Sequence, residues 1–166
     1  MMKDYSQNLR RRFADEVYEA MRADEKIFVV TGDLGYGVWD KVRSEFPERF
    51  LNVGAAEQNL IGIGVGLALE GKIPILYTIT PFLLFRPFET IRNYVDHEKI
   101  PVIMVGSGRD KEYAEEGFSH WSEEDREVMK IFKNINSVWP MTTDEVSEIL
   151  PKALFSKEPW YINLKR

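Results

Sequence analysis

The sequence predicts an α/β fold with three layers, α/β/α, built on a mostly parallel sheet of about six strands. Apolar runs of strand length alternate along the chain with longer segments of helical periodicity. The apolar runs are typical of strands that are covered on both faces. At 166 residues the chain is long enough for one domain with a full core, so we expect residues 1–166 to form a single domain.

Composition excludes several classes of protein. The net charge of −5 gives no electrostatic reason to expect a nucleic acid or an anionic membrane as partner. There is no cysteine, so neither a disulfide framework nor thiolate chemistry is available. The amino terminus lacks the apolar core of a signal peptide, and we expect a cytoplasmic protein. The aromatic fraction of 13% suits either a planar ligand or a large subunit interface.

Local patterns then place the elements in order. Leu9, Phe13, Val17 and Met21 recur every four residues among charged ones, which predicts a first amphipathic helix. Later helices are bounded by prolines and by Thr143, the expected N-cap of the last helix. The expected helices are 6–24, 38–46, a buried one that begins near residue 57, 87–98, 123–132 and 144–155; the expected strands are 27–30, 50–53, 73–79, 101–105, 137–140 and 160–164.

The loop that follows the first strand, residues 31–37, is rich in glycine and superficially suggests a phosphate-binding turn. Its spacing is not G-x-G-x-x-G, and no Gly-Lys-Ser/Thr follows. A dinucleotide-binding or P-loop interpretation is therefore disfavoured, and a flexible loop at the sheet edge is the plain alternative.

The stretch from Val53 to Arg92 organises the rest of the chain. Glu57 falls in the first turn of a helix at the carboxyl edge of the sheet, where open α/β sheets bind ligands. That helix is apolar almost all round and is interrupted by Gly62, Gly64 and Gly66, each of which costs roughly 1 kcal/mol relative to alanine. Close approach of another backbone would explain the glycines, from either the sheet or a neighbouring subunit.

Three phenylalanines, Phe82, Phe85 and Phe88, follow the next strand at a spacing of three. We expect residues 80–86 to form an irregular turn, with Pro87 as the first residue of a helix. Rings at this spacing are more often core residues than the wall of a ligand site. Their position beside Glu57 favours the ligand wall.

The run FLNVGAAEQNLIGIGVGLALEGKIPILYTITPFLLFRPFETIR resembles the pyrimidine-binding domain of the transketolase family of thiamine-diphosphate enzymes, which includes the deoxyxylulose-phosphate synthases. The resemblance implies that Glu57 hydrogen-bonds the ring nitrogen of the cofactor's aminopyrimidine and acts catalytically. It also implies that Phe82, Phe85 and Phe88 wall the pyrimidine. Asp33 and Leu34, in GDL, match the family's loop after the first strand and are expected near the cofactor.

The segment EGFSH, in a long charged loop of the kind that is usually functional, resembles the family's substrate loop. The resemblance implies that His120 is catalytic and faces the substrate, and that Glu116 and Arg166 bind substrate, with Arg11 or Arg12 as a further phosphate ligand. The chain departs from transketolases at Glu116 and Trp121, where they carry aspartate and glutamine, and it lacks their histidine near 106–108. A standard sugar-phosphate donor is therefore not secure.

The family's G-D-G motif with its downstream asparagine, which holds the diphosphate and Mg²⁺, does not occur in this sequence. We therefore expect no metal ligands in this chain, and we expect the diphosphate-binding and C-terminal domains to be absent. A separate diphosphate-binding subunit would bind Mg²⁺ and complete a homodimer or heterotetramer.

The resemblance thus implies one subunit of a transketolase-like enzyme that transfers a two-carbon ketol or acyl unit from a small sugar-like substrate to an aldehyde or ketone acceptor. The alternatives are a subunit of a thiamine-diphosphate-dependent 2-oxo-acid decarboxylase and a non-catalytic regulatory subunit.

Overall fold

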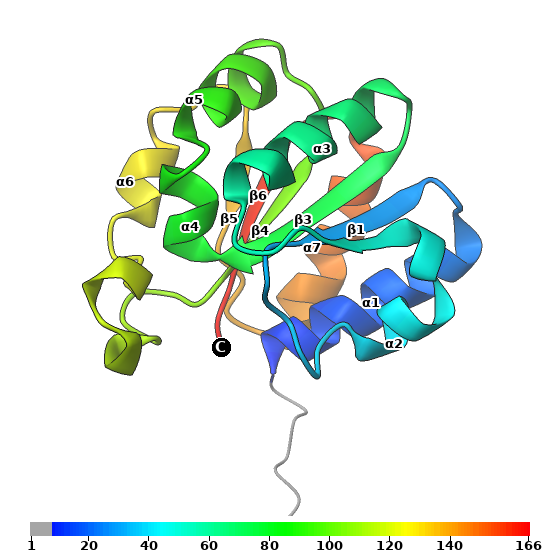
Figure 1. The fold of residues 1–166 in the computed structure, drawn as a ribbon, viewed down its shortest axis with the longest axis horizontal. Coiled ribbons are helices and arrows are strands. Elements are labelled where there is room, and N and C mark those ends of the chain that lie inside the picture. Colours follow the sequence, from blue (N-terminus) through cyan, green and yellow to red (C-terminus); the bar gives the residue numbers. More distant parts are fainter. Residues whose placement is uncertain (1–7) are drawn as a thin grey trace, which may run out of the picture.

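The computed structural model describes residues 8–166 and contains one six-stranded parallel sheet, with strand order β2-β1-β3-β4-β6-β5 (Figure 1). The predicted α/β fold with its parallel sheet is confirmed. The first two residues of the helix expected at 6–24 lie outside the described residues. Within residues 8–166, no helix is both long and apolar enough to cross a membrane.

The elements alternate between strand and helix along the whole described chain. The strands are β1 (Ile27–Thr31), β2 (Phe50–Asn52), β3 (Ile73–Ile79), β4 (Ile103–Ser107), β5 (Asn136–Val138) and β6 (Trp160–Leu164). The helices are α1 (Leu9–Ala23), α2 (Asp40–Glu45), α3 (Glu57–Leu69), α4 (Thr80–Phe85), α5 (Phe88–Thr90), α6 (Asp125–Met129) and α7 (Thr143–Phe155), with a π-helical segment η2 (Ile91–His97) and short 3₁₀ turns η1 (Pro47–Arg49), η3 (Ala114–Glu116) and η4 (Phe118–His120).

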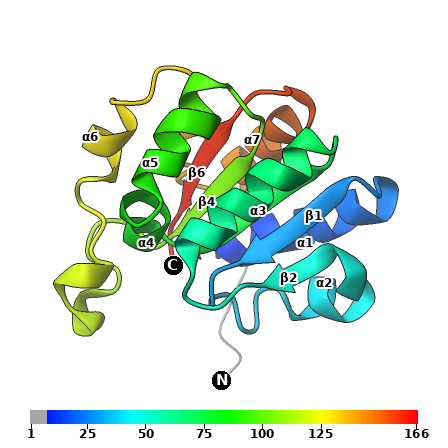
Figure 2. The same ribbon diagram turned by 45° about the horizontal axis from the view of Figure 1, so that its top comes forward.

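Helices cover both faces of the sheet, as expected for three layers (Figure 2), and an apolar core lies against each face. Helices α1 and α7 cover one face, where they pack against inward residues such as Val29 and Ile75. Helices α3, α4 and α6 and segment η2 cover the other, against Val30 and Leu76. The strands are therefore buried on both sides, which explains their continuous apolar sequences.

The strand order reverses between β1 and β3, because β2 lies on one side of β1 and the chain then crosses to the other side. Ligands of open α/β sheets bind at such a reversal, outside the carboxyl ends of the strands. The two strands are held together there by Gly32, whose N–H donates to Tyr77 O at 3.0 Å and whose carbonyl accepts from Thr78 Oγ1 at 3.0 Å.

The segment predicted as an irregular turn at 80–86 is in fact helical, and this prediction was wrong. Pro81 lies in the first turn of α4, where a missing N–H costs no hydrogen bond. Pro87 ends the helix after Phe85 and serves as N-cap of α5, instead of starting one long helix.

Other boundaries shift by one to three residues, for local reasons. The N-cap of α7 is Thr142 and not Thr143, because the Thr142 hydroxyl accepts the N–H of Glu145 at 3.2 Å. Strand β4 begins and ends two residues later than predicted. Pro74 is accommodated inside β3 because pairing with β4 begins only at Ile75.

Candidate functional site

Glu57 is the first residue of α3 and is only 2% exposed. The chain enters the helix through Gly54, whose φ of 71° favours glycine. The side-chain oxygen of Asn52 accepts the N–H of Gly54 at 2.9 Å and that of Asp33 at 3.0 Å. One amide therefore joins the loops after β1 and β2 beside Glu57.

The two carboxylate oxygens of Glu57 have different surroundings. Oε2 accepts a hydrogen bond from Arg86 Nη1 at 2.6 Å, within an ion pair. Oε1 is buried and has no hydrogen-bond partner. A buried polar atom without a partner is rare and calls for an explanation, and a ligand with a complementary polar atom would supply one.

The three phenylalanines differ in their surroundings within this chain. Phe82 is half-buried, with the Arg86 guanidinium 3.7 Å from its ring centroid and the His120 ring 4.9 Å away in a T-shaped contact. Phe85 is 47% exposed. Phe88 packs against Phe132 at 5.3 Å, on the side of the second core. Phe82 is thus the ring that shares a contact with the Glu57 site, and the roles predicted for Phe85 and Phe88 stay predictions.

His120 is the last residue of η4, the 3₁₀ turn that begins directly after Gly117, and it is half-buried. Its Nδ1 lies 3.0 Å from the Ser119 hydroxyl, and its ring is 6.2 Å from that of Tyr113. The contact with Phe82 brings His120 to the same side of the sheet edge as Glu57, since Arg86 bridges Phe82 and Glu57. Sequence alone placed these residues 63 positions apart.

The loop that carries His120 is fixed at its root by buried hydrogen bonds. The Arg109 guanidinium donates to Asn163 Oδ1 at 2.8 Å, to Asn163 O at 2.7 Å and to Pro140 O at 3.1 Å. Burial lowers the pKa of Arg109, while the neighbouring Glu112 opposes that change. Ser122 Oγ donates to Gly108 O at 3.2 Å and closes the other end of the loop.

Glu116 and Arg166, both predicted to bind substrate, lie close together. Arg166 Nη1 is 3.8 Å from Glu116 Oε1, and its guanidinium lies 4.8 Å from the Tyr113 ring centroid. The arginine of α1 that reaches this edge is Arg10, whose Nη1 is 3.4 Å from the Ser107 hydroxyl.

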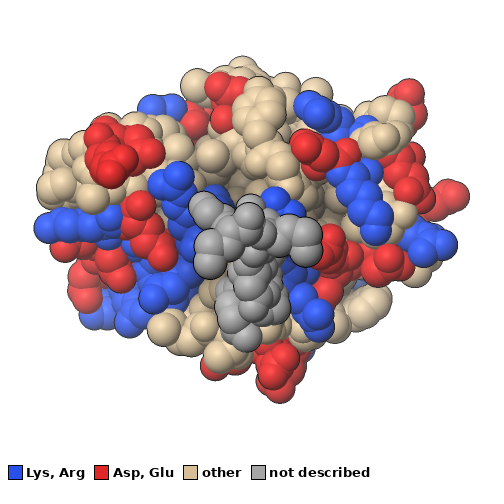
Figure 3. All heavy atoms as spheres, turned by 90° about the horizontal axis from the view of Figure 1, so that it is seen from below, with Lys and Arg blue, Asp and Glu red and all other residues tan. Residues whose placement is uncertain are grey.

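Arg12, one of the two α1 arginines offered as alternative phosphate ligands, pairs with Glu16 at 2.6 Å and donates to Ser147 of α7, and the predicted role stays a prediction. Arg11 is exposed. Seen from the carboxyl edge, the molecule carries basic and acidic side chains interspersed over its surface (Figure 3).

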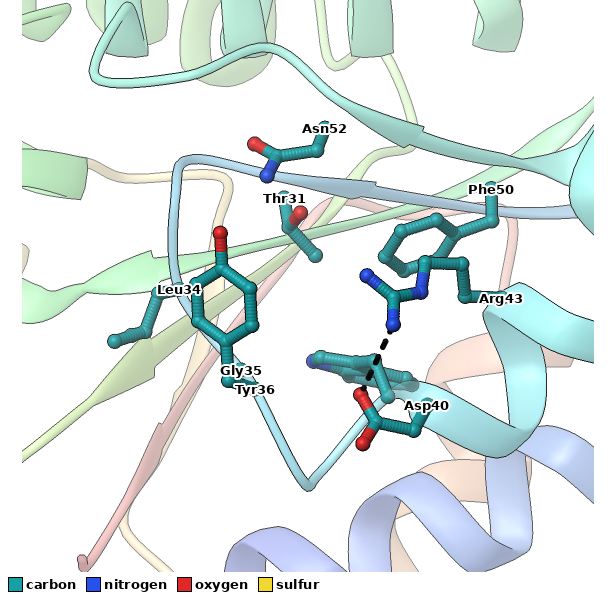
Figure 4. A pocket seen from close by; sticks show the side chains of 9 residues that line it. Thr31, Leu34, Gly35, Tyr36, Asp40, Arg43, Phe50 and Asn52 are labelled. Carbon is teal, nitrogen blue, oxygen red and sulfur yellow. Dashed lines mark ion pairs between the residues drawn. The ribbon is translucent and has the colours of Figure 1, made fainter.

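Asp33 and Leu34 lie in the loop after β1, and Leu34 borders a small cavity (Figure 4). Asp33 is exposed, and Leu34 lines the cavity, whose volume is about 40 Å³. That volume admits only one or two water molecules. An ion pair of 3.7 Å between Arg43 and Asp40 lies beside it. The cofactor contacts predicted for Asp33 and Leu34 stay predictions.

A buried polar cluster is centred on Asp125. Asp125 Oδ2 accepts from Trp139 Nε1 at 2.7 Å and from the Tyr161 hydroxyl at 2.9 Å. Burial raises the pKa of Asp125, although these two hydrogen bonds oppose the change. Burial and the nearby Asp125 raise the pKa of Tyr161 well above its ordinary value, and burial raises the pKa of Tyr77 to about 12. Both phenols therefore remain protonated, and the Tyr161 hydroxyl donates to Asp125.

Sequence reasoning missed the two arginines that shape this edge, Arg86 and Arg109. Arg86 directly follows one of the three rings, and an arginine next to an aromatic residue and across from a buried glutamate was the available signal. Arg109 offered none, because its partners are mostly backbone carbonyls that only the fold brings near. No group of three or more His, Asp or Glu side chains within residues 8–166 is arranged to hold a metal ion.

A buried carboxylate and an aromatic ring lie at the reversal point of the parallel sheet, where open α/β sheets bind ligands. Residues 6–166 match the family described as "Transketolase, pyrimidine binding domain", and the chain belongs to that family. Membership implies binding of thiamine diphosphate. The unpartnered Oε1 of Glu57 and the ring of Phe82 fit the pyrimidine half of that cofactor.

Several curated and solved proteins are similar to this chain. It is 31% identical to a putative transketolase C-terminal section of Methanocaldococcus jannaschii over 95% of this chain and 50% of that protein. It is 36% identical to one of the subunits of the apulose-4-phosphate transketolase of Actinobacillus succinogenes, over 72% of this chain and 39% of that protein. A structure described as a split gene transketolase, inactive beta4 tetramer, matches with TM-score 0.84 and 32% identity over 96% of this chain and 51% of that one.

A transketolase from Leishmania mexicana matches with TM-score 0.86 at 20% identity over 96% of this chain and 25% of that one, and so supports the fold alone. The chain thus spans about half or less of the length of these relatives.

Proposed function

We propose that this chain is the pyrimidine-binding subunit of a two-component, thiamine-diphosphate-dependent transketolase-like enzyme. The observation that carries the proposal is Glu57, a carboxylate buried at the head of α3 with one oxygen unpartnered. When bound, thiamine diphosphate supplies a nucleophilic carbon that attacks a carbonyl donor. A two-carbon ketol or acyl unit would pass from that donor to an aldehyde or ketone acceptor.

The task of Glu57 in this proposal is to hold a proton at a ring nitrogen of the aminopyrimidine. Oε1 is the atom for that contact, because it is buried and has no hydrogen-bond partner among the described residues. Burial keeps water from competing for the same proton, which is the condition such a contact needs. Phe82 offers an aromatic face for the flat ring.

The substrate side of the site is assigned to the loop with His120. His120 contacts the same Phe82 ring and carries an imidazole, the side chain most often used as a general acid or base. The neighbouring pair of Glu116 and Arg166 offers one acidic and one basic group for a hydroxylated or anionic substrate. Asp33 would approach the cofactor from the loop after β1.

The other half of the site is assigned to a separate diphosphate-binding subunit, which would hold the diphosphate and Mg²⁺. Two relatives support this, since one is named as a single subunit of a transketolase and another as a split gene transketolase whose beta4 tetramer is inactive. The sequence itself has no G-D-G motif. We propose that the assembly is a heterotetramer or contains a homodimer of this chain.

The test is Glu57→Gln in the complex reconstituted with the diphosphate-binding subunit. Glutamine keeps the size and hydrogen-bonding capacity of the side chain but cannot share a proton in the same way. Exchange of the cofactor's C2 proton and turnover should both fall by roughly 10²-fold or more. The matched control is Glu70→Gln, at the exposed far end of α3, which should change neither. Wild-type exchange in an assembled Glu57→Gln complex would refute the proposed role of this site.

A further inference from the structure

Arg86 holds both of the groups that an aminopyrimidine would need in this site. Its Nη1 lies 2.6 Å from Glu57 Oε2, and its guanidinium carbon lies 3.7 Å from the centroid of the Phe82 ring. Among the described residues, these are the ion pair and the aromatic contact of this side chain.

A guanidinium and an aminopyrimidine make the same demands on their surroundings. Both are flat and carry N–H donors, and both lie against an aromatic face while hydrogen-bonding a carboxylate. A site built from one carboxylate and one phenyl ring therefore accepts either group. The two groups could use different oxygens of Glu57, but they cannot both lie on the same face of the Phe82 ring.

We propose that Arg86 occupies the place of the pyrimidine when the cofactor is absent, and that it must swing away from Glu57 and Phe82 for the cofactor to bind. Arg86 is thus an internal competitor of the cofactor. The inference rests on the proposed function, because it names the pyrimidine as the ligand of this site.

The two partners of the ion pair differ in their freedom to move. The Arg86 side chain is 44% exposed, whereas that of Glu57 is 1% exposed. Arg86 lies at the junction between α4 and α5, directly before Pro87, so its surroundings on the solvent side are open. Displacement would therefore move the arginine into water and leave the carboxylate in place.

Arg86 also offsets an energetic cost that Glu57 would have in the site without its cofactor. A carboxylate buried without a partner is costly, and breaking a buried pair by removing one member is strongly unfavourable. Arg86 compensates the charge of Glu57 until the cofactor arrives. Because Oε1 stays unpartnered in the meantime, an incoming ring has one contact to form before the arginine leaves.

The strength of the competition follows from the exposure of the arginine. A half-exposed ion pair and a half-exposed cation–π contact together favour the occupied state by roughly 5- to 30-fold in an equilibrium constant. The cofactor can bind only to the fraction of molecules in which Arg86 has left Glu57 and Phe82, so the apparent affinity is weaker by the same factor. Removing the guanidinium should therefore tighten cofactor binding by roughly 5- to 30-fold.

The experiment measures the dissociation constant of thiamine diphosphate, with Mg²⁺, by calorimetry on the complex reconstituted with the diphosphate-binding subunit. Arg86→Met keeps the long stem but loses the charge and the plane, and Arg86→Lys keeps the charge alone. The matched control is Arg92→Met, an exposed arginine nearby that hydrogen-bonds Asn93 at 3.0 Å. Thermal melting of each variant checks that it folds and assembles.

The expected order of affinity is Arg86→Met tightest, Arg86→Lys intermediate, and Arg92→Met equal to wild type. If wild type binds and Arg86→Met binds equally or more weakly, Arg86 is no competitor, and the proposed function survives. If neither wild type nor any variant binds thiamine diphosphate, the proposed function is refuted and the inference with it.

Discussion

Gly64→Ala and Gly62→Ala are expected to shift the free energy of unfolding in opposite directions, although both replace a glycine inside the same helix. A Cβ at Gly64 would lie 2.5 Å from Cδ1 of Leu76, a fully buried residue of β3, so the helix must move away from the sheet. Such overpacking costs roughly 1–3 kcal/mol. The higher helix propensity of alanine returns roughly 1 kcal/mol. The net change for Gly64→Ala is a loss of roughly 0–2 kcal/mol.

A Cβ at Gly62 or at Gly66 would meet no atom within 4 Å, so each alanine there should gain roughly 1 kcal/mol of stability in the isolated chain. Urea denaturation followed by circular dichroism measures the three variants against wild type, with the slope of the transition as a check that the compactness of the states is unchanged. Gly64→Ala matching the gain of the other two would show that α3 does not press on Leu76, and the reasoning would fail.

Two further predictions concern single titratable groups. Burial raises the folded-state pKa of Asp125, so the stability that this carboxyl contributes is fully present below its unfolded pKa and is lost as pH rises through the folded value. Denaturation of wild type and of Asp125→Asn between about pH 4 and pH 7 should therefore show that the free energy of unfolding of the variant, relative to wild type, increases as pH rises. A relative free energy that stays constant or decreases with pH would contradict this assignment. His120→Ala should lower turnover of the reconstituted complex by roughly 10²-fold and leave cofactor affinity nearly unchanged. The matched variant His97→Ala, at an exposed position, should alter neither quantity. An equal loss of turnover and affinity in His120→Ala would mean that His120 belongs to the cofactor site or stabilises the fold.

The layered architecture was predictable because it depends on periodicity. Short apolar runs such as 73–79, flanked by breakers and rich in β-branched residues, favour strands buried on both faces, and β3 occupies the predicted residues. The boundaries at prolines were less predictable. Pro81 and Pro87 have the same local chemistry, yet one lies in the first turn of α4 and the other caps α5. Only the packing of Leu83 and Leu84 into the core decides that the segment between them is helical.

The site was predictable in its residue types and less so in its geometry. Glu57 could be located because a helix start after a strand lies at the sheet edge whatever the topology. The side-chain partners could not, since the contact of Phe82 with His120 depends on a loop whose course is set by Arg109 and Asn163. Long-range hydrogen bonds of this kind leave no periodic trace in a sequence.

The glycines of α3 connect the fold to assembly. Two explanations were open for them, close approach of the sheet or of a neighbouring subunit, and Gly64 satisfies the first through Leu76. Gly62 and Gly66 are exposed, and a Cβ added at either would meet no atom within 4 Å. No close contact within the described chain therefore explains the stability that these two glycines cost. Glu57 begins the same helix and needs a dry environment for its proposed chemistry. A subunit that packed its backbone on the open glycines would explain their presence and also exclude water from the head of α3.

Gly62→Ala should therefore stabilise the isolated chain yet weaken assembly with the proposed diphosphate-binding subunit, which sedimentation of the mixture can measure. A variant that both gains stability and assembles like wild type would contradict this link between α3 and the partner subunit.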